Sequence, residues 1–138
     1  MKKTLIMSAL AVPMLVASVE PRASLYQEQA ATSQAGVASY YADRFHGRRT
    51  ASGARYDRNG FSAAHRTLAL GTEVRVTDIG SGESVVVRIN DRGPFARGRV
   101  IDLSRAAAAE IGLTRKGLSE VRLDVLNRSR PLTLSDVF

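Results

Sequence analysis

Residues 73–104, EVRVTDIGSGESVVVRINDRGPFARGRVIDLS, carry most of the information about the fold. At 73–78 valine alternates with polar side chains, as it does in a strand with one buried face. A glycine-rich turn at 80–82 leads to an apolar run at 84–90, which predicts the partner strand of a hairpin. A third strand is expected at 99–102. The stretch therefore predicts a fold built from short β-strands.

The residues that follow predict a helix and a closing strand. Ser104 is a suitable N-cap for an alanine-rich helix over 105–111, and Gly112 ends this helix. At 121–125 valine and leucine alternate with charged residues, which indicates another strand. A chain of this size must close or cover the edges of its sheet. We therefore expect a mainly β fold, a compact barrel with short helices.

The N-terminus has the layout of a secretory signal peptide. Two lysines precede an uncharged apolar stretch at 5–19, which is short for a membrane span. An uncleaved membrane anchor is the alternative. The sequence has no cysteine that could carry an N-terminal lipid, so we expect a soluble product without a stable membrane anchor. The predicted organisation is a signal peptide at 1–18, a flexible leader at 19–35, the folded domain at 36–126 and a short tail at 127–138.

Charge and composition narrow the classes of partner. The net charge of +7 suits an anionic partner, either nucleic acid or a carboxylate-bearing polymer. The arginines are spread along the chain, and no aromatic-rich basic motif of the RNA-binding kind is present, so we expect no nucleic-acid partner. With no cysteine and only His46 and His65, the sequence lacks the ligand spacing of a metal site. We expect no metal and no cofactor.

Two aspartates at strand ends are candidates for chemistry. Asp91 lies just before a Gly-Pro turn at the end of one predicted strand, and Asp102 ends the next. Neighbouring strand ends can bring both carboxylates to one rim, which is the arrangement that glycoside-cleaving sites need. The alternative is structural, with Asp91 and Arg92 pairing with other charges to hold the turn. Spacing alone leaves both interpretations open.

Several segments, taken in order, resemble one family. They are GVASYY (36–41), FHGRRTASG (45–53), AAHRTLALGTEVRVTD (63–78), VVVRINDRGPF (85–95) and RVIDLSRAAAAEIGL (99–113). Together they resemble the RlpA-like family of bacterial double-psi β-barrel proteins. The resemblance implies a six-stranded double-psi β-barrel, exported to the periplasm, with peptidoglycan lytic transglycosylase activity. Such enzymes break the MurNAc–GlcNAc bond of peptidoglycan glycan strands without water and leave a 1,6-anhydro-MurNAc end.

The resemblance also implies roles for single residues. Asp91 is the aspartate of the family's N-D-R-G motif and is expected to act as general acid and base. His65 matches a histidine of the family's pocket that can orient the substrate or a carboxylate. The alternative is a neutral histidine that holds a loop by hydrogen bonds. Aromatic faces stack on pyranose rings and hydroxyl groups bind their polar atoms, so the expected sugar contacts are Tyr40, Tyr41, Thr50, Ser52 and Arg92.

The sequence departs from the family at one catalytic position. The family loop reads T-A-N-G-E, and its glutamate is the second catalytic carboxylate, whereas residues 50–54 here read TASGA. The methyl group of Ala54 cannot stabilise a cationic transition state. Asp102, which resembles the aspartate of the D-L-S segment in expansins, or Asp57 can compensate. We favour Asp102, because a Tyr-Asp pair beside a glycine turn is more often local structure.

Two further expectations follow from the resemblance. Without compensation for the missing glutamate, the protein is a non-catalytic peptidoglycan-binding or expansin-like wall-remodelling barrel. Many family members carry a C-terminal glycan-binding repeat domain, whereas this sequence stops at Phe138, so septal targeting is not expected.

Overall fold

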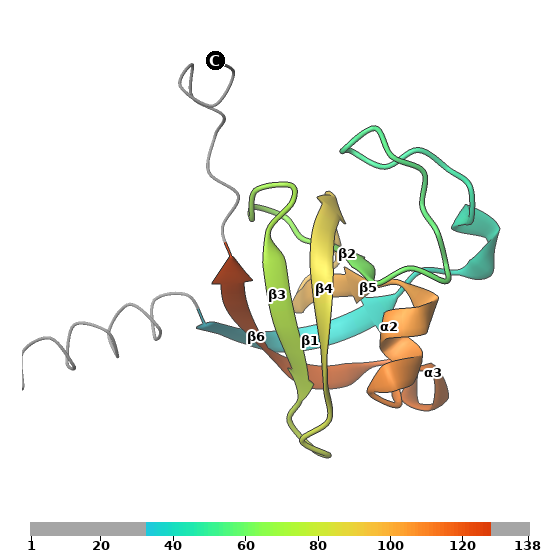
Figure 1. Ribbon diagram of the computed structural model, residues 1–138. Coiled ribbons are helices and arrows are strands. Elements are labelled where there is room, and N and C mark those ends of the chain that lie inside the picture. Colours follow the sequence, from blue (N-terminus) through green and yellow to red (C-terminus); the bar gives the residue numbers. More distant parts are fainter. Residues whose placement is uncertain (1–32, 128–138) are drawn as a thin grey trace, which may run out of the picture.

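The computed structural model describes residues 33–127, which fold into a closed β-barrel (Figure 1). The mainly β barrel with short helices expected from the sequence is confirmed. The expected signal peptide at 1–18, most of the leader and the tail from residue 128 lie outside the described residues. The elements in chain order are β1 (Ser33–Tyr40), η1 (Asp43–Phe45), β2 (Ser62–Ala64), β3 (Glu73–Asp78), β4 (Ser84–Asp91), β5 (Arg99–Leu103), α2 (Arg105–Glu110), α3 (Leu113–Lys116) and β6 (Ser119–Asn127).

The barrel mixes parallel and antiparallel pairs. Its strand order is β1-β5-β2-β4-β3-β6. β1 runs parallel to β5 and β2 runs parallel to β4, while the other neighbours are antiparallel. The hairpin expected around residues 80–82 joins β3 to β4. Closure gives every strand two neighbours, so no sheet edge is left unpaired among the described strands. Within residues 33–127, no helix has the length and apolar character needed to cross a membrane.

The alternating apolar residues of the strands fill the barrel. Aliphatic side chains at alternate positions of β3, β4, β5 and β6 are buried, as their alternation predicts, although Val85 and Val125 near strand ends are only partly buried. The helices add apolar side chains to the same core. Its members are Ala38, Ala63, Val74, Val76, Val87, Ile89, Ile101, Leu103, Ala107, Ala108, Ile111, Leu113, Val121 and Leu123.

The helix predicted after Ser104 is confirmed, and it packs against β1, β4 and β5. The Ser104 hydroxyl accepts a hydrogen bond from the main-chain N–H of Ala107 at 3.3 Å, which satisfies one free donor of the first helical turn. Gly112, with φ of 74°, ends this segment in the left-handed region that favours glycine. The short helix α3 then leads into β6.

A buried aspartate holds the end of the barrel formed by the β3–β4 hairpin. Asp78 is fully buried, and its carboxylate accepts hydrogen bonds from Lys116 Nζ at 2.9 Å and Ser119 Oγ at 3.0 Å. The main-chain N–H groups of Gly80 and Ser81 donate to the other oxygen. Burial by itself raises the pKa of Asp78, but these hydrogen bonds outweigh it and leave the pKa below its usual value.

The start of β1 and the presence of β2 differ from the sequence-based expectation. β1 begins at Ser33 and not at residue 36, because the main chain of Ser33 pairs with Asp124 of β6. Pairing of this kind depends on the partner strand, and residues 33–35, Ser-Gln-Ala, show no alternation that would predict it. β2 was not among the strands predicted from the sequence, because it has only three small residues and is too short to show periodicity.

Candidate functional site

Four neighbouring strands place two aspartates and two small residues in one row. Ser39 of β1 is the register partner of Asp102 of β5, and Asp102 is in turn the partner of Ala64 of β2. On its other side Ala64 is paired with Asp91 of β4. Adjacent strands lie about 4.8 Å apart, so the Cα atoms of Asp91 and Asp102 are separated by roughly 9–10 Å. Contrary to our expectation, β4 and β5 are not adjacent, but both flank β2, and this brings the two aspartates into one row.

A register shift changes the direction in which the Asp91 side chain points. Ala63 pairs with Ile89, but the next residue, Ala64, pairs with Asp91, so Asn90 is skipped. Ile89 points into the core, and strict alternation would turn Asp91 inward as well. Bulges of this type commonly redirect a side chain next to a functional site. The shift places Asp91, which is only partly buried, in the row with Ala64 and Asp102.

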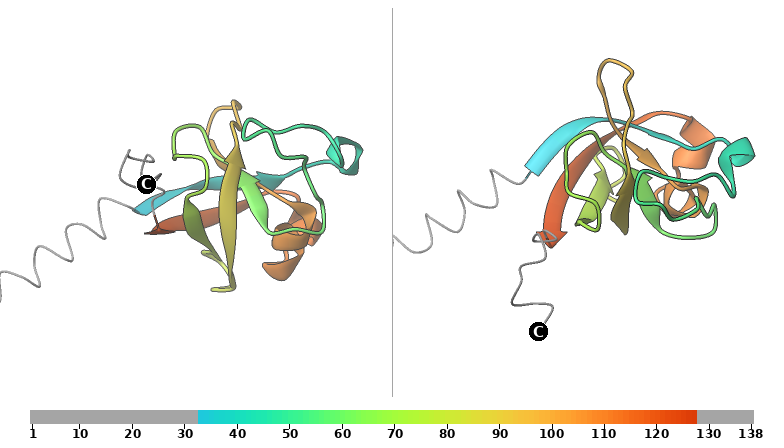
Figure 2. Two further views of the ribbon diagram at one scale, coloured as in Figure 1. Left: turned by 45° about the horizontal axis from the view of Figure 1, so that its top comes forward. Right: turned by 90° about the horizontal axis from the view of Figure 1, so that it is seen from above.

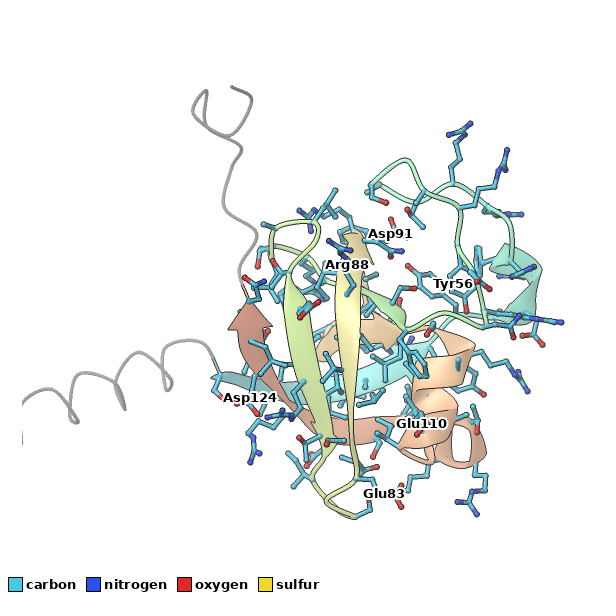
Figure 3. The ribbon with its side chains drawn as sticks, in the orientation of Figure 1. Tyr56, Glu83, Arg88, Asp91, Glu110 and Asp124 are labelled. Carbon is cyan, nitrogen blue, oxygen red and sulfur yellow. The ribbon has the colours of Figure 1, made fainter. Side chains whose placement is uncertain are left out.

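The carboxylate of Asp91 is held by three donors. Oδ1 accepts the main-chain N–H of Ala51 and that of Arg92, both at 2.9 Å. Oδ2 accepts the hydroxyl of Tyr41 at 2.6 Å. Figure 3 shows Asp91 at the upper end of β4, far from Glu83 at the hairpin end. These contacts fix the orientation of the carboxylate with groups from three parts of the chain.

Tyr41 is a neutral donor in this arrangement. Burial, the hydrogen bond to Asp91 and the charges of Asp91 and Asp102 all raise its pKa far above the usual value of a tyrosine. The ring is fixed by Phe45 and Tyr56, whose centroids lie at 6.0 Å and 4.5 Å. The Tyr41 hydroxyl therefore keeps its proton at any physiological pH and donates it in a hydrogen bond.

Asp102 has a simpler environment. Its Oδ1 accepts a hydrogen bond from the hydroxyl of Ser39, which is buried. Its charge also acts on Tyr41, the residue that binds Asp91. Asp102 is partly exposed, so solvent or a ligand can reach its carboxylate. Ser39 was not among the site residues expected from the sequence, although it stands two positions before Tyr41.

A tight turn packs against Asp91. The pairing of Arg49 with Arg55 closes this turn, and its main-chain N–H at Ser52 donates to Asn90 O at 3.1 Å. The Thr50 hydroxyl donates to the carbonyl of Ala54 at 2.7 Å and lies 2.8 Å from the Ser52 hydroxyl. The structure thus brings Thr50 and Ser52 beside Asp91.

Ala54 lies at the end of the same turn. Its side chain is exposed, and the turn uses only its main-chain N–H and carbonyl. Asp57, the other residue considered as a substitute carboxylate, accepts the main-chain N–H of Asn59 at 2.9 Å. Asp57 is thereby engaged in its own local turn, whereas Asp102 lies in the row with Asp91.

His65 and Arg92 act on the segment that follows β2. His65 Nδ1 accepts the main-chain N–H groups of Thr67 and Leu68 at 3.1 Å, and Nε2 lies 2.9 Å from Gln34 Oε1. Since Nδ1 accepts, Nε2 carries the proton and donates to Gln34. Burial, with the nearby charges of Arg92 and Arg66, lowers the pKa of His65. These contacts correspond to the alternative of a neutral histidine that holds a loop.

The guanidinium of Arg92 is directed away from the neighbouring carboxylate. It donates to the carbonyl of Leu68 at 2.6 Å and to that of His65 at 3.2 Å. Arg92 contacts Asp91 through its main-chain N–H. Among the described residues neither Asp91 nor Arg92 forms a salt bridge with another charged side chain, as the structural alternative supposed, and Arg92 instead holds the loop at 65–68.

One expected sugar contact lies apart from this group. Tyr40 packs against the core, and its hydroxyl lies 3.5 Å from the carbonyl of Thr114 in α3. Successive strand residues point to opposite faces, so Tyr40 and Tyr41 separate. Within residues 33–127, no group of three or more histidine or acidic side chains is placed to hold a metal ion.

Comparisons with known proteins show which family the sequence is similar to. The family model described as "Lytic transglycolase" matches residues 33–123. A relative from Synechocystis sp., named probable endolytic peptidoglycan transglycosylase RlpA, is 58% identical over 91 residues, which cover 66% of this chain and 28% of the relative. Endolytic peptidoglycan transglycosylase RlpA from Pasteurella multocida is 47% identical over 116 residues, with 84% and 40% covered. The chain thus spans less than half the length of these relatives.

Solved structures with low identity share the fold. A Streptomyces papain inhibitor matches with a TM-score of 0.56 and 23% identity, over 69% of this chain and 94% of the inhibitor. An expansin from Clavibacter michiganensis matches with a TM-score of 0.54 and 19% identity, over 73% of this chain and 54% of the expansin. Because both identities are below 25%, the likeness concerns the barrel fold alone.

Proposed function

The chain belongs to the RlpA-like lytic transglycolase family of double-psi β-barrels, and from this premise we propose that it is an endolytic peptidoglycan lytic transglycosylase. Its substrate is the glycan strand of peptidoglycan, cut at the MurNAc–GlcNAc bond. The observation that carries the proposal is the carboxylate of Asp91, presented at the rim of the barrel and oriented by three donors.

In the proposed reaction, Asp91 is the general acid and base. It delivers a proton to the glycosidic oxygen as the bond from that oxygen to C1 of MurNAc breaks. The C6 hydroxyl of the same sugar attacks C1 and passes its proton to the Asp91 carboxylate. The new bond from O6 to C1 closes the 1,6-anhydro ring, so no water is consumed and Asp91 returns to its starting form. Because the nucleophile is tethered to the reacting sugar, proximity supplies much of the rate.

Asp102 is the second carboxylate of the proposed site. The family glutamate is replaced by Ala54, and Asp102 brings a negative charge to the same row as Asp91. A negative charge there stabilises the cationic sugar as the glycosidic bond breaks. Ala64, between them, has no side chain long enough to block a sugar ring.

The remaining site residues bind the sugar or position other parts of the site. Thr50 and Ser52 lie next to Asp91 and are the proposed contacts for sugar hydroxyl groups, while Tyr41 orients the Asp91 carboxylate. His65 and Arg92 are positioning residues, since both hold the loop at 65–68. Neither needs to touch the substrate for this role.

We also infer that the protein works in the periplasm, where its substrate lies. The charge and apolar pattern of residues 1–18 supports export. Fractionation of cells that express the tagged protein tests this inference. Recovery of the protein in the cytoplasm, at the full length of the chain, would contradict it.

Product chemistry tests the proposed activity. The protein is incubated with purified glycan strands, with and without stem peptides, and the products are analysed by mass spectrometry. We expect fragments that end in 1,6-anhydro-MurNAc. Strands that are bound but remain uncut would mean that the barrel holds glycan without cleaving it, and reducing MurNAc ends would indicate hydrolysis.

A further inference from the structure

An exposed aromatic ring lies four positions after Asp91 in the chain. Phe95 lies in the segment that joins β4 to β5, which begins directly after Asp91, and 80% of its surface is exposed. This is the highest exposure among the large apolar side chains that the structure describes as exposed. Figure 2 shows this gold-coloured loop projecting from the barrel. An aromatic ring left in water lacks the free energy that burial would supply, so covering it with a ligand would be favourable.

The exposure does not result from a loose loop. The guanidinium of Arg66 donates to the carbonyls of Pro94 and Ala96, on both sides of Phe95. At the end of the loop, Val37 N donates to Gly98 O at 3.1 Å, which ties the loop to β1. Phe95 is therefore presented by a main chain that is held at several points.

The ring also has a defined direction. A Cβ atom added at Gly93 would lie 3.7 Å from Cε2 of Phe95, so the ring folds back over Gly93. Gly93 has φ of +123°, a conformation that L side chains rarely adopt. The glycine thus permits both the turn and the close approach of the ring. The ring of Phe95 therefore lies over Gly93, which is two positions after Asp91 in the chain.

We propose that Phe95 is a sugar-binding platform, which stacks on a pyranose ring of the glycan strand that crosses Asp91. This inference rests on the proposed function. One face of a pyranose ring presents mainly C–H groups, and an aromatic ring covers such a face without having to satisfy hydrogen bonds. Stacking at Phe95 fixes where the strand runs relative to Asp91. Phe95 touches the strand beside the cleaved bond and is a binding residue.

A single-tryptophan variant tests the contact directly. The sequence contains no tryptophan, so Phe95→Trp introduces one fluorescent reporter at the platform. Ile79→Trp is the matched control, because Ile79 is also exposed but lies in the hairpin at the opposite end of β3 and β4. On addition of soluble glycan strands, we expect a saturable change in emission from the variant at 95 and none from the variant at 79.

The kinetic test uses Phe95→Ala. We expect KM for soluble strands to rise by about 3- to 10-fold, the range expected for loss of one aromatic stacking contact, with a much smaller change in kcat. Ile79→Ala should match the wild type. If strands still bind but the emission of the variant at 95 does not change, the platform proposal is wrong and the proposed function stands. If the emission changes only with protein concentration, the ring contacts a second copy of the protein, and the platform proposal is also wrong. If the wild type neither binds nor cleaves strands, both proposals are wrong.

Discussion

The hydroxyl of Tyr41 donates a hydrogen bond of 2.6 Å to Oδ2 of Asp91. The two residues lie fifty positions apart in the chain, and the barrel brings them together at one rim. Since burial and the neighbouring carboxylates keep the tyrosine protonated, this bond is always made with the hydroxyl as donor. It orients the carboxylate that the proposed reaction uses for proton transfer.

Removing this hydroxyl should slow the reaction without unfolding the protein. For Tyr41→Phe we expect kcat/KM for glycan strands to fall by about 10- to 100-fold, the value of one hydrogen bond to a charged group. The ring stays packed on Tyr56, so the melting temperature should change little. Tyr40→Phe is the control, because that hydroxyl is directed to α3. Equal activity of the two variants would remove Tyr41 from the site.

The missing family glutamate can be restored. Ala54 is exposed and its turn uses only main-chain atoms, so Ala54→Glu should alter the free energy of unfolding by less than about 0.5 kcal/mol. We expect kcat to increase, because a second carboxylate then faces the substrate. Asp102→Asn should lower kcat by about 100-fold or more in the wild type and by clearly less in the Ala54→Glu background.

This double-mutant cycle separates two explanations. Equal losses from Asp102→Asn in both backgrounds would show that Asp102 does not replace the glutamate. Asp57→Asn is the internal control, since Asp57 is held in its own turn and should leave kcat unchanged in both backgrounds.

His65 makes stability depend on pH in the neutral range. Its pKa is lowered by burial and by Arg92 and Arg66, so as pH falls below about 6.5 the unfolded chain binds a proton before the folded protein does. The free energy of unfolding therefore decreases from pH 6.5 down to the folded pKa, by at most about 1.4 kcal/mol per pH unit. Urea titrations of His65→Gln should lack this slope, whereas His46→Gln should retain it. A slope unchanged in His65→Gln would assign it to another group.

Asp78 makes the free energy of unfolding depend on pH in the acidic range. Burial opposes its charge, but hydrogen bonds from Lys116, Ser119 and two main-chain groups hold the pKa below 3.8. The stabilisation is present above about pH 4 and is lost as pH falls through the folded pKa. At pH 7, Asp78→Asn should lower the free energy of unfolding by about 2–4 kcal/mol. Glu83→Gln, exposed in the same hairpin, should have no measurable effect.

Much of the barrel could be predicted from local patterns. Alternation at 73–78 and 121–125 identifies β3 and β6, and the apolar run after the glycine turn identifies β4. Ser104 and Gly112 mark the helix because capping is chemistry within a few residues. β2 could not be found in this way, because its three small residues are buried on both sides and show no period.

The sequence predicts that Asp91 and Asp102 stand at strand ends, but it does not predict how they are arranged. The register places both beside Ala64. The register shift that skips Asn90 brings Asp91 into this row. It depends on how β2 pairs with β4, so the local sequence does not indicate it. The same applies to the hydroxyl of Ser39 on Asp102.

The most direct test of the account compares wild type and Asp91→Asn on purified glycan strands. The asparagine has the same shape and can still accept the two main-chain N–H groups, so the variant should fold and bind strands as the wild type does. We predict 1,6-anhydro-MurNAc ends from the wild type and none from the variant, as measured by mass spectrometry. Anhydro products at the same rate from both proteins would contradict the assignment of Asp91 as the acid and base.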